Sequence, residues 1–469
     1  MTLSEFIVKH ENDDLAAIVL HRDRWPDIDV ALAAECIASR RKLRLKVPQW
    51  YADPGLVCPV AISAEQCSST ATASYKAAVA RSAGVLAEEQ RFEPEANARL
   101  SVHGGGRDGA CKAGDVGSPG AAGVLGAEPP QKSIRRIADL TGGLGIDCWQ
   151  FSKVAGAVLY NEMNPVLFEA AKANLKRLGC DNVEFSNICI SPSTLPELLD
   201  SFQPDLVFAD PARRSGGRKV FMPEDCSPDV LALQDIILGR GCRFMVKLSP
   251  MADISMLLRK FHCVKELHIV EADGECKELL MLMEPGFSGE TAIVAGIARR
   301  EDKAGLHFAI SEEKSAVPMF ISAMPEPGQL LFEPGPALAK SGAFKLINEK
   351  FGLRKLGTDA HLYISDSIVP DLEGLGKWFE IIDVAPFGKV AMRDFAARWP
   401  AAGVTARALP LSSDELRLKL DSFSKKTVQS GKLVTSSAIT ADQGIHLFGI
   451  GTILGRLLLT CRFRELADL

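Results

Sequence analysis

The chain lacks the cysteine pairs that mark a zinc ribbon or a dithiol redox site. Its twelve cysteines are scattered over 469 residues, and no two of them form a Cys-x-x-Cys pair. Some, such as Cys148 and Cys242, lie among apolar residues, where a thiol packs as a small hydrophobic group. This usage indicates a reducing compartment, and we expect a cytoplasmic protein without a metal site.

Long apolar runs are also missing. The first residues, 1–14, are acidic and carry too few apolar side chains for a signal peptide. The longest apolar stretch, 446–463, contains Arg456 and falls short of the ~20 apolar residues that span a bilayer. We therefore expect no membrane partner.

Neither sign of charge is in large excess. The 54 Lys and Arg residues against 59 Asp and Glu residues give a formal net charge of −5. This balance excludes binding of a polyanion by overall charge and leaves local basic patches possible. With 47% hydrophobic and 24% charged residues the composition is globular, and the length allows about two to four domains.

The first two parts of the chain differ sharply in composition. Residues 1–93 favour helices, one over 29–47 and another beginning at Ser63, which opens a capping-box pattern. Residues 94–130 predict a flexible linker or insertion, because 101–130 holds nine glycines and no Phe, Tyr, Trp or Ile. A phosphate-binding loop is the alternative, although no strand flanks it and Gly-Lys-Ser/Thr is absent.

Strands and helices alternate over residues 131–285. Helical patterns, the clearest over 164–179, separate the first five short apolar runs. Such alternation indicates a parallel sheet with helical crossovers. The runs 264–272 and 277–283 have only a short Asp-Gly link between them, which predicts a final antiparallel hairpin at the sheet edge.

The remaining part, residues 286–469, predicts an α+β arrangement. Its apolar segments 291–300 and 306–310 have the character of strands, whereas 336–352 and 412–423 favour helices. Further strands are expected over 361–366, 378–385, 403–409 and 432–437.

The first strand of the alternating part ends in a glycine-rich turn, DLTGGLGID, at 139–147. Gly142, Gly143 and Gly145 would let the backbone approach a ligand without a side-chain clash. The pattern Gly-x-Gly-x-x-Gly is not met, since Cys148 stands at its third glycine, so a hydride-transfer cofactor is disfavoured. A purely structural turn is the alternative.

Acidic residues end two further strands. Glu162 follows the second strand, where a carboxylate can accept hydrogen bonds from both hydroxyls of a ribose, with an ordinary solvated acid as the alternative. Asp210 follows the fourth strand. Because ligands of open α/β sheets bind at the carboxyl ends of the strands, Asp139, Glu162 and Asp210 should converge.

The loop after the fourth strand reads DPARRSGGRK, at 210–219. Asp210 and Pro211 form a stiff turn. The four cations that follow suit contacts with a phosphate backbone, although a solvated charge run is the alternative for the distal pair. They are Arg213, Arg214, Arg218 and Lys219.

Together, DLTGGLGID, Glu162, DPARR and the closing hairpin resemble the class I S-adenosylmethionine-dependent methyltransferases. More narrowly, the chain resembles the bacterial methyltransferase family with a THUMP-like C-terminal domain. The segments that carry this closer resemblance are WYADPGLVCPVAISAEQCSSTATASYKA (50–77), VKLSPMADI (246–254), ECKELL (275–280) and LLFEPGPALAKSGAF (330–344). The resemblance implies a Rossmann-like methyltransferase sheet after a helical N-terminal domain and before an α+β THUMP-like domain.

The resemblance implies S-adenosylmethionine as the cofactor and places its contacts residue by residue. The positions implied are Asp139, Thr141, Gly142, Gly143 and Gly145 in the turn, Glu162 at the ribose, and Asp210, Pro211 and Arg213 in the catalytic loop. Many relatives carry an acid after the third strand that binds the adenine amino group. This chain has Asn187 in that region, and we expect it to be the substitute.

The catalytic loop departs from the Asp/Asn-Pro-Pro-aromatic pattern of enzymes that methylate exocyclic amines, because Ala212 and Arg213 replace its last two residues. It is similar to the loop of the uridine C5-methyltransferases, which need a cysteine at the end of the following strand. Leu248 stands there, so we expect direct transfer without a cysteine nucleophile.

The expected function is methylation of structured RNA, such as tRNA or rRNA, with RNA contacts at 214–219 and in the basic run 40–46, including Arg40 and Arg41. The RNA partner follows from the resemblance, since composition alone does not suggest it. A small-molecule or protein methyltransferase is one alternative. A non-catalytic RNA-binding protein that retains the fold is another. The pattern does not indicate an oligomeric state.

Overall fold

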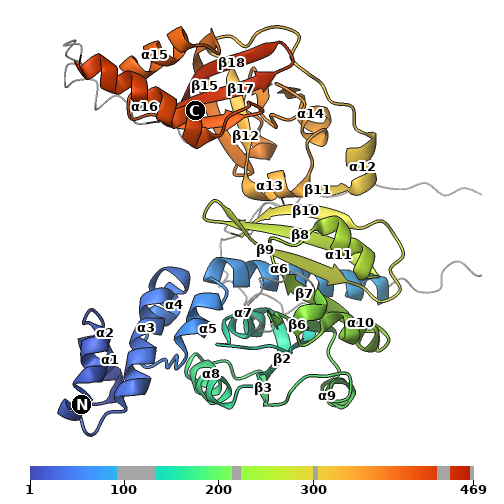
Figure 1. Cartoon of the computed structure of the whole chain (residues 1–469). Helices are drawn as coiled ribbons and strands as arrows, with labels where there is room; N and C mark the ends of the chain where they lie inside the picture. Colours follow the sequence, from blue (N-terminus) through green and yellow to red (C-terminus); the bar gives the residue numbers. More distant parts are fainter. Residues whose placement is uncertain (92–133, 214–222, 299–304, 430–443, 465–469) are drawn as a thin grey trace, which may run out of the picture. The chain divides into compact units, whose positions relative to one another are not determined.

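The computed structural model describes residues 1–91, 134–213, 223–298, 305–429 and 444–464 (Figure 1). Contacts divide the chain into two compact units, 1–210 with 235–243 and 211–234 with 244–469, which are taken in turn. The expected linker 94–130, the strand over 432–437, and Arg214, Arg218 and Lys219 lie outside the described residues. The four-part division by sequence therefore stays a prediction.

The first unit opens with helices, as the sequence predicts. They are α1 (Leu3–Lys9), α2 (Leu15–Leu20), the 3₁₀ turn η1 (Arg22–Arg24), α3 (Val30–Lys46), α4 (Pro48–Tyr51), α5 (Ala61–Gln66) and α6 (Thr70–Arg91). Asp29 caps α3 by accepting a hydrogen bond from Leu32 N. The capping box at Ser63 is wrong: α5 begins at Ala61, whose N–H donates to the Glu35 carboxylate of α3.

Four strands of the first unit form a parallel array, in the order β4-β1-β2-β3. They are β1 (Ile134–Asp139), β2 (Ala155–Asn161), β3 (Val183–Ser186) and β4 (Leu206–Ala209), connected through α7 (Ile146–Val154), α8 (Pro165–Arg177) and α9 (Leu195–Phe202). Ile137, Ala138 and Val158 are fully buried, as in a sheet covered on both faces. The carboxyl ends of the strands share one edge, and the predicted site residues follow those ends.

The second unit contains the predicted hairpin, β8 (Val264–Ala272) and β9 (Glu275–Met283), which are antiparallel. Its turn residues, Asp273 and Gly274, both have positive φ angles, as a tight Asp-Gly hairpin turn requires. Strand β9 also pairs antiparallel with β7 (Arg243–Leu248).

The sheet continues beyond the hairpin, which the sequence pattern did not indicate. Strand β10 (Ala292–Ile297) pairs parallel with β8, and β11 (Leu306–Ala309) pairs antiparallel with β10. These two strands come from the segment that we grouped with the C-terminal part. They cover the hydrogen-bonding groups that the edge of β8 would otherwise expose.

Shorter elements occupy the rest of this stretch of the chain. They are β5 (Ala212–Arg213), η2 (Pro223–Asp225), β6 (Cys226–Ser227), α10 (Val230–Leu238), α11 (Ile254–Lys260) and α12 (Ile310–Ser315).

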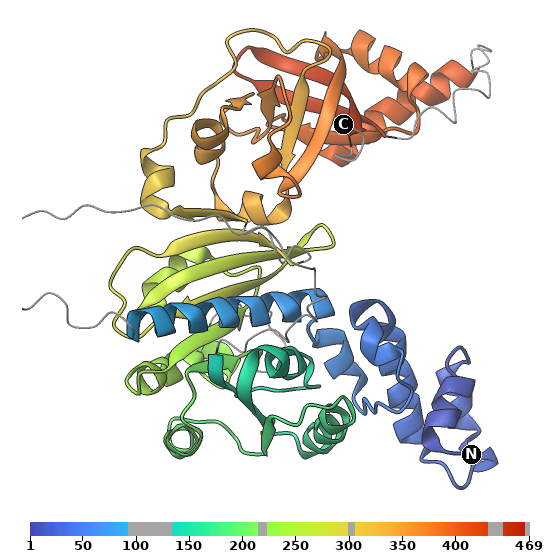
Figure 2. The same ribbon diagram turned by 180° about the vertical axis from the view of Figure 1, so that it is seen from behind.

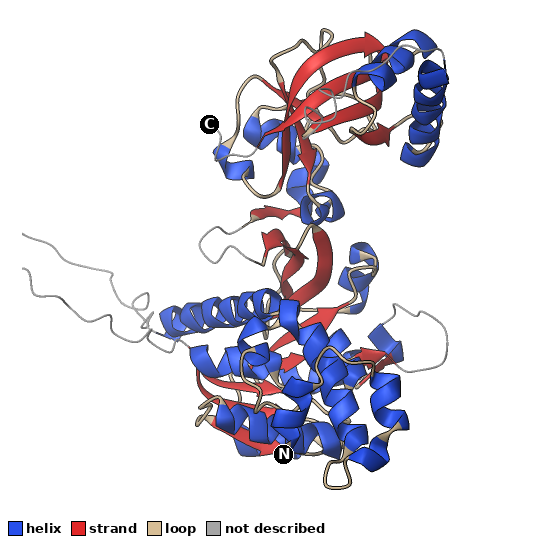
Figure 3. Cartoon of the chain, turned by 90° about the vertical axis from the view of Figure 1, so that its left-hand side faces the viewer, coloured by secondary structure: helices blue, strands red, loops and turns tan. Residues whose placement is uncertain are grey.

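A second sheet completes the predicted α+β C-terminal part, in the order β13-β14-β12-β15-β18-β17-β16. Its strands are β12 (Leu330–Pro334), β13 (Arg354–Lys355), β14 (Tyr363–Ser365), β15 (Gly376–Pro386), β16 (Gly403–Arg407), β17 (Ile445–Thr452) and β18 (Gly455–Arg464). Its helices are α13 (Pro336–Ser341), α14 (Leu346–Phe351), η3 (Pro370–Leu372), α15 (Lys389–Arg398) and α16 (Ser413–Gln429). Figure 3 shows α15 and α16 against one face, where Phe395 and Leu416 pack on Leu447.

Two expectations for this part need correction or refinement. The single helix expected over 336–352 is two helices, because Gly342 adopts φ 77° and ends α13. The long apolar stretch 446–463 is the hairpin β17–β18, whose alternate residues enter apolar clusters on the two faces of the sheet. No helix in the described part of the chain is long and apolar enough to cross a membrane.

A buried amide joins the N-terminal helices to the parallel array. Asn174 of α8 is 2% exposed; its Nδ2 donates to Val57 O at 2.7 Å and its Oδ1 accepts from Val57 N at 2.9 Å. Beside it, Arg177 forms a two-point ion pair with Asp53, and the Arg177 side chain is about half exposed. The amide therefore satisfies both main-chain groups of Val57.

Replacing Asn174 by Ala should lower the free energy of unfolding by about 2–4 kcal/mol, because both polar groups of Val57 lose their partner in a part-buried place. Replacing Arg177 by Ala, which removes only a half-exposed ion pair, should cost less than about 1 kcal/mol. Urea denaturation of both variants measures the difference. Equal losses would contradict the role given to the amide.

Candidate functional site at the carboxyl edge of the parallel strands

The glycine-rich turn follows β1 and leads directly into α7. Asp139 is 1% exposed, and its Oδ1 accepts a hydrogen bond from Thr141 N at 3.1 Å. Gly143 and Gly145 have φ angles of 53° and 89°, in the left-handed region that favours glycine. Strand, turn and helix thus stand in the order that brings main-chain N–H groups to a ligand.

Gly142 is required for a different reason. A Cβ atom at this position would lie 2.1 Å from the ring of Tyr160 on β2. The Tyr160 hydroxyl donates to Gly143 O at 2.6 Å, and Gly142 N donates to Asn161 O at 2.7 Å. Strand β2 is therefore hydrogen-bonded to the glycine turn and packs against it. Tyr160 helps to form the site, and our sequence analysis missed it.

Asn161, also missed, joins three segments at this edge. Its side chain is 1% exposed; Nδ2 donates to Leu140 O at 3.0 Å and Ile188 O at 3.1 Å, while Oδ1 accepts from Ile188 N at 3.1 Å. The ends of β1 and β2 and the segment after β3 are thereby fixed to one another. The available signal was a second polar residue, next to Glu162, near the end of the apolar run 157–162.

Glu162 lies beside the turn. Its Oε2 accepts a hydrogen bond from Gly143 N at 2.9 Å, and its Oε1 accepts from Asn164 N at 2.8 Å. Asn187, which is exposed, donates from Nδ2 to the main-chain oxygen of Glu162. The structure therefore brings Glu162, Asn187 and the glycine turn together.

Asp210 joins the same group through its main chain, since its N–H donates to Thr141 Oγ1 at 2.7 Å. The eight candidate residues of the first unit are thus gathered at one edge: Asp139, Thr141, Gly142, Gly143, Gly145, Glu162, Asn187 and Asp210. Pro211 and Arg213 belong to the second unit, where Ala212–Arg213 form β5 against β6.

The electrostatics of Asp139 are unusual for an aspartate. Burial, and next the carboxylate of Asp147, raise the pKa of Asp139 well above its ordinary value. Its Oδ2 is buried and has no hydrogen-bond partner among the described residues. A buried carboxylate oxygen in this state is suited to an incoming cationic group.

Two arginines of the basic run 40–46 make hydrogen bonds within the N-terminal helical part. Arg40 is 6% exposed and donates to Tyr51 O at 2.8 Å and Asp53 O at 3.3 Å. Arg41 donates to Glu11 O at 2.7 Å and to Asp13 O. Main-chain carbonyls therefore accept hydrogen bonds from both guanidinium groups, and the RNA contacts expected of Arg40 and Arg41 stay a prediction.

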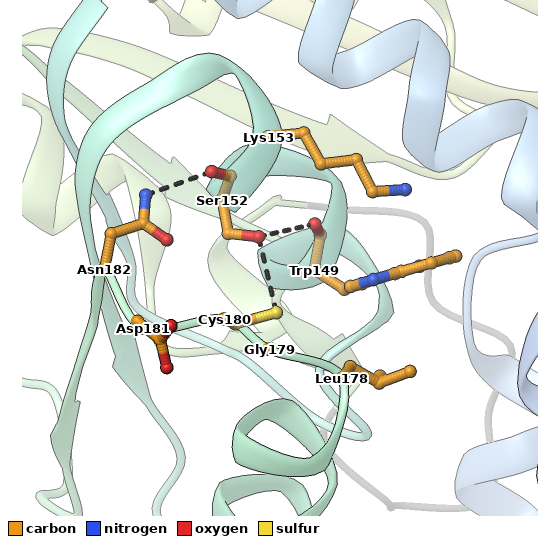
Figure 4. A pocket seen from close by; sticks show the side chains of 8 residues that line it. All are labelled: Trp149, Ser152, Lys153, Leu178, Gly179, Cys180, Asp181 and Asn182. Atoms are coloured by element: carbon orange, nitrogen blue, oxygen red, sulfur yellow. Dashed lines mark hydrogen bonds between the residues drawn. The ribbon is translucent and has the colours of Figure 1, made fainter. Parts of the chain in front are cut away.

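A pocket of about 340 Å³ lies elsewhere in the first unit (Figure 4). Trp149, Ser152, Lys153, Leu178, Gly179, Cys180, Asp181 and Asn182 line it. These residues lie at the carboxyl end of α7 and just before β3, whereas the candidate residues follow the carboxyl ends of the strands. The pocket is therefore not part of the site described above.

Known proteins are similar to this chain in sequence and in fold. A solved structure from Porphyromonas gingivalis W83, named as a methyltransferase, is 27% identical, with a TM-score of 0.71 over 99% of this chain and 98% of that chain. Relatives from Mycobacterium tuberculosis CDC 1551 and H37Rv are 25% identical over 61% of this chain and 74% of their own length. Both are named uncharacterized S-adenosylmethionine-dependent methyltransferases. A ferredoxin-like domain model matches residues 330–372.

The chain has the methyltransferase fold, with a helical N-terminal part and an α+β C-terminal part that includes the ferredoxin-like match. It is an S-adenosylmethionine-dependent methyltransferase, as its relatives are named.

Replacing Gly142 by Ala should weaken binding of S-adenosylhomocysteine at least about tenfold, because the new methyl group and the Tyr160 ring cannot occupy the same space. Gly388→Ala is the matched control, since a Cβ there meets nothing closer than 3.9 Å and φ is −169°. Isothermal titration calorimetry compares the two. Equal affinity in both variants would show that the turn does not hold the cofactor.

Proposed function

We propose that this methyltransferase transfers the methyl group of S-adenosylmethionine directly to a nucleotide of structured RNA. The observation that carries the chemistry is the convergence of Asp139, Glu162 and Asp210 at one edge, with Thr141 bonded to the main chain of Asp210. The RNA substrate rests on the THUMP-like resemblance and on the ferredoxin-like match at 330–372.

The residues at the edge fit S-adenosylmethionine in chemical type. The buried Oδ2 of Asp139, which has no hydrogen-bond partner in the part of the chain that the structure describes, can accept a hydrogen bond from the amino-acid ammonium group. Each carboxylate oxygen of Glu162 accepts one main-chain N–H and keeps capacity for a ribose hydroxyl. The Oδ1 of Asn187 can accept a hydrogen from the adenine amino group, in place of the acid of other relatives.

The bound cofactor supplies an electrophilic methyl group on sulfonium, so the chain mainly supplies orientation. Asp210 accepts the hydrogen, and finally the proton, of the attacking nitrogen or oxygen. The hydrogen bond from its N–H to Thr141 Oγ1 fixes the start of the catalytic loop, and Pro211 has a fixed φ angle and restricts the backbone of Asp210 before it. Arg213 is proposed to hold a phosphate of the substrate.

Direct transfer is proposed because the residues present do not supply a thiolate where one would be needed. Leu248 ends β7 and is buried. Burial raises the pKa of Cys242, which precedes β7, to about 11, and burial also raises the pKa of Cys276 on β9. Both thiols are thereby kept protonated and unreactive near neutral pH.

The C-terminal part is proposed to bind RNA away from the reacting base. Helix α15 carries three exposed cations, Lys389, Arg393 and Arg398, on a rigid element that packs on the sheet. Arg214, Arg218 and Lys219 would add contacts near Asp210. Such contacts give binding that weakens steeply with salt. A cytoplasmic location, expected from the cysteine usage, would place the enzyme beside tRNA and rRNA.

Incubation with labelled S-adenosylmethionine and total RNA from cells that lack the enzyme should transfer label to RNA. Nucleoside mass spectrometry then identifies the product. Label that enters a small-molecule or protein extract and leaves RNA unlabelled would overturn the RNA proposal while keeping the methyltransferase assignment.

Asp210→Asn should lower kcat by about 10²–10⁴-fold, because the amide cannot take the proton, while cofactor affinity changes little. Asp181→Asn, an exposed substitution just before β3, is the matched control and should leave kcat unchanged. Steady-state kinetics with the RNA substrate measures both. Full kcat in Asp210→Asn would remove the proposed role.

A further inference from the structure

A fully buried lysine forms an ion pair with the first turn of the helix that follows the glycine-rich turn. Lys76 belongs to α6, the long blue helix of Figure 2, which packs against α7 and β1. Its side chain is 0% exposed, and its Nζ lies 2.9 Å from Asp147 Oδ1 and 2.6 Å from Ser68 Oγ. The ring of Phe208 on β4 is centred 5.6 Å from the same ammonium group. A charge so far from water is costly unless a counter-charge accompanies it.

The counter-charge comes from the first turn of α7. Asp147 is 9% exposed, and its Oδ2 accepts a hydrogen bond from Ser68 Oγ at 2.8 Å. Ser68 thus bridges the ammonium and the carboxylate, receiving from one and donating to the other. The three side chains form one compensated group, contributed by the α5–α6 connection, α6 and α7.

The charged members of this group act electrostatically on the acid that ends β1. Several groups from the surrounding elements act on Asp139: Asp147 and Cys148 from α7, Tyr160 from β2, Asp210 after β4, and Lys76 from α6. Both Asp147 and Asp210 raise the pKa of Asp139, whereas Lys76 lowers it. Two buried carboxylates at close range share a proton unless a cation compensates one of them.

We propose that Lys76 is a positioning residue for the cofactor site: its buried ammonium group neutralises Asp147 and so keeps Asp139 an anionic acceptor for the ammonium group of S-adenosylmethionine. The inference rests on the proposed contact between Asp139 and the cofactor. It gives the N-terminal helices a part in cofactor binding, since Ser68 and Lys76 both precede the first strand.

Three variants separate this role from a purely structural one. Lys76→Met leaves two uncompensated carboxylates, so the pH below which cofactor affinity is lost should rise by about one unit or more. Asp147→Asn removes one anion and leaves the Lys76 ammonium group acting on Asp139. The pH midpoint of cofactor binding should therefore fall below that of the wild type. The double variant, Lys76→Met with Asp147→Asn, has neither charge, so its pH midpoint should return toward the wild-type value. A loss of packing alone would not restore the midpoint.

The measurement is calorimetric titration of the full chain with S-adenosylhomocysteine, which carries the same ammonium group, at several pH values. At pH 7, titration in buffers of different ionisation enthalpy should show release of about one proton on binding to Lys76→Met and almost none for the wild type. Lys153→Met is the control, because Lys153 lies on α7 with its Nζ over the Trp149 ring, outside the site.

The outcomes are distinct. Binding by the wild type with the same pH midpoint in all the variants would overturn the inference and leave the methyltransferase assignment intact. No binding by the wild type would remove the cofactor site itself. If Lys76→Met does not fold, Lys76→Gln decides, because it removes the charge and keeps a polar side chain: a midpoint above that of the wild type supports compensation by Lys76, and an unchanged or lower midpoint contradicts it.

Discussion

The site depends on the three hydrogen bonds of the Asn161 side chain. This buried amide bonds to the main chain of Leu140 and of Ile188, so it joins the ends of β1 and β2 and the segment after β3. The neighbouring residues then act from fixed positions: Tyr160 holds the glycine turn and Glu162 accepts from it. Adjacent strands alone would bring these residues to the same edge, but the amide fixes how the three loops meet.

A second constraint is the burial of charge at this edge. Asp139 is enclosed by apolar strands and by other acids, a state that is favourable only with a cation nearby. One such cation belongs to the protein: Lys76, whose Nζ lies 2.9 Å from Asp147 Oδ1. The ammonium group of the cofactor is proposed to be the second. In this proposal, Lys76 of the N-terminal helices and the ammonium group of the cofactor both compensate the negative charge of buried carboxylates.

The sequence was sufficient to predict those features that depend only on one strand and the residues next to it in the chain. The turn at 139–147, Glu162 and Asp210 stand where apolar runs end, and the carboxyl ends of parallel strands share an edge. The hairpin at Asp273–Gly274 follows from its turn chemistry. Asn161, Tyr160 and Lys76 could not be found this way, because their roles depend on groups that only tertiary packing brings close.

The same reasoning explains what the local pattern did not indicate. Ser63 has the local signature of a cap, but Glu35 from another helix satisfies the N-terminal N–H group of α5. Arg40 and Arg41 have the composition of a basic patch, yet the main chain of their own domain occupies them. Residues 291–310 have the pattern of strands, but the pattern does not say which sheet they join. Only the pairing with β8 assigns β10 to the sheet of the β8–β9 hairpin.

Replacing Glu162 shows whether the carboxyl edge of the first unit is the cofactor site. S-adenosylmethionine titrated into the wild-type chain should bind, and Glu162→Ala should lose that binding while keeping the wild-type circular dichroism spectrum. Undiminished affinity in Glu162→Ala would contradict the account, because the carboxylate that lies beside the glycine turn would then have no part in holding the cofactor.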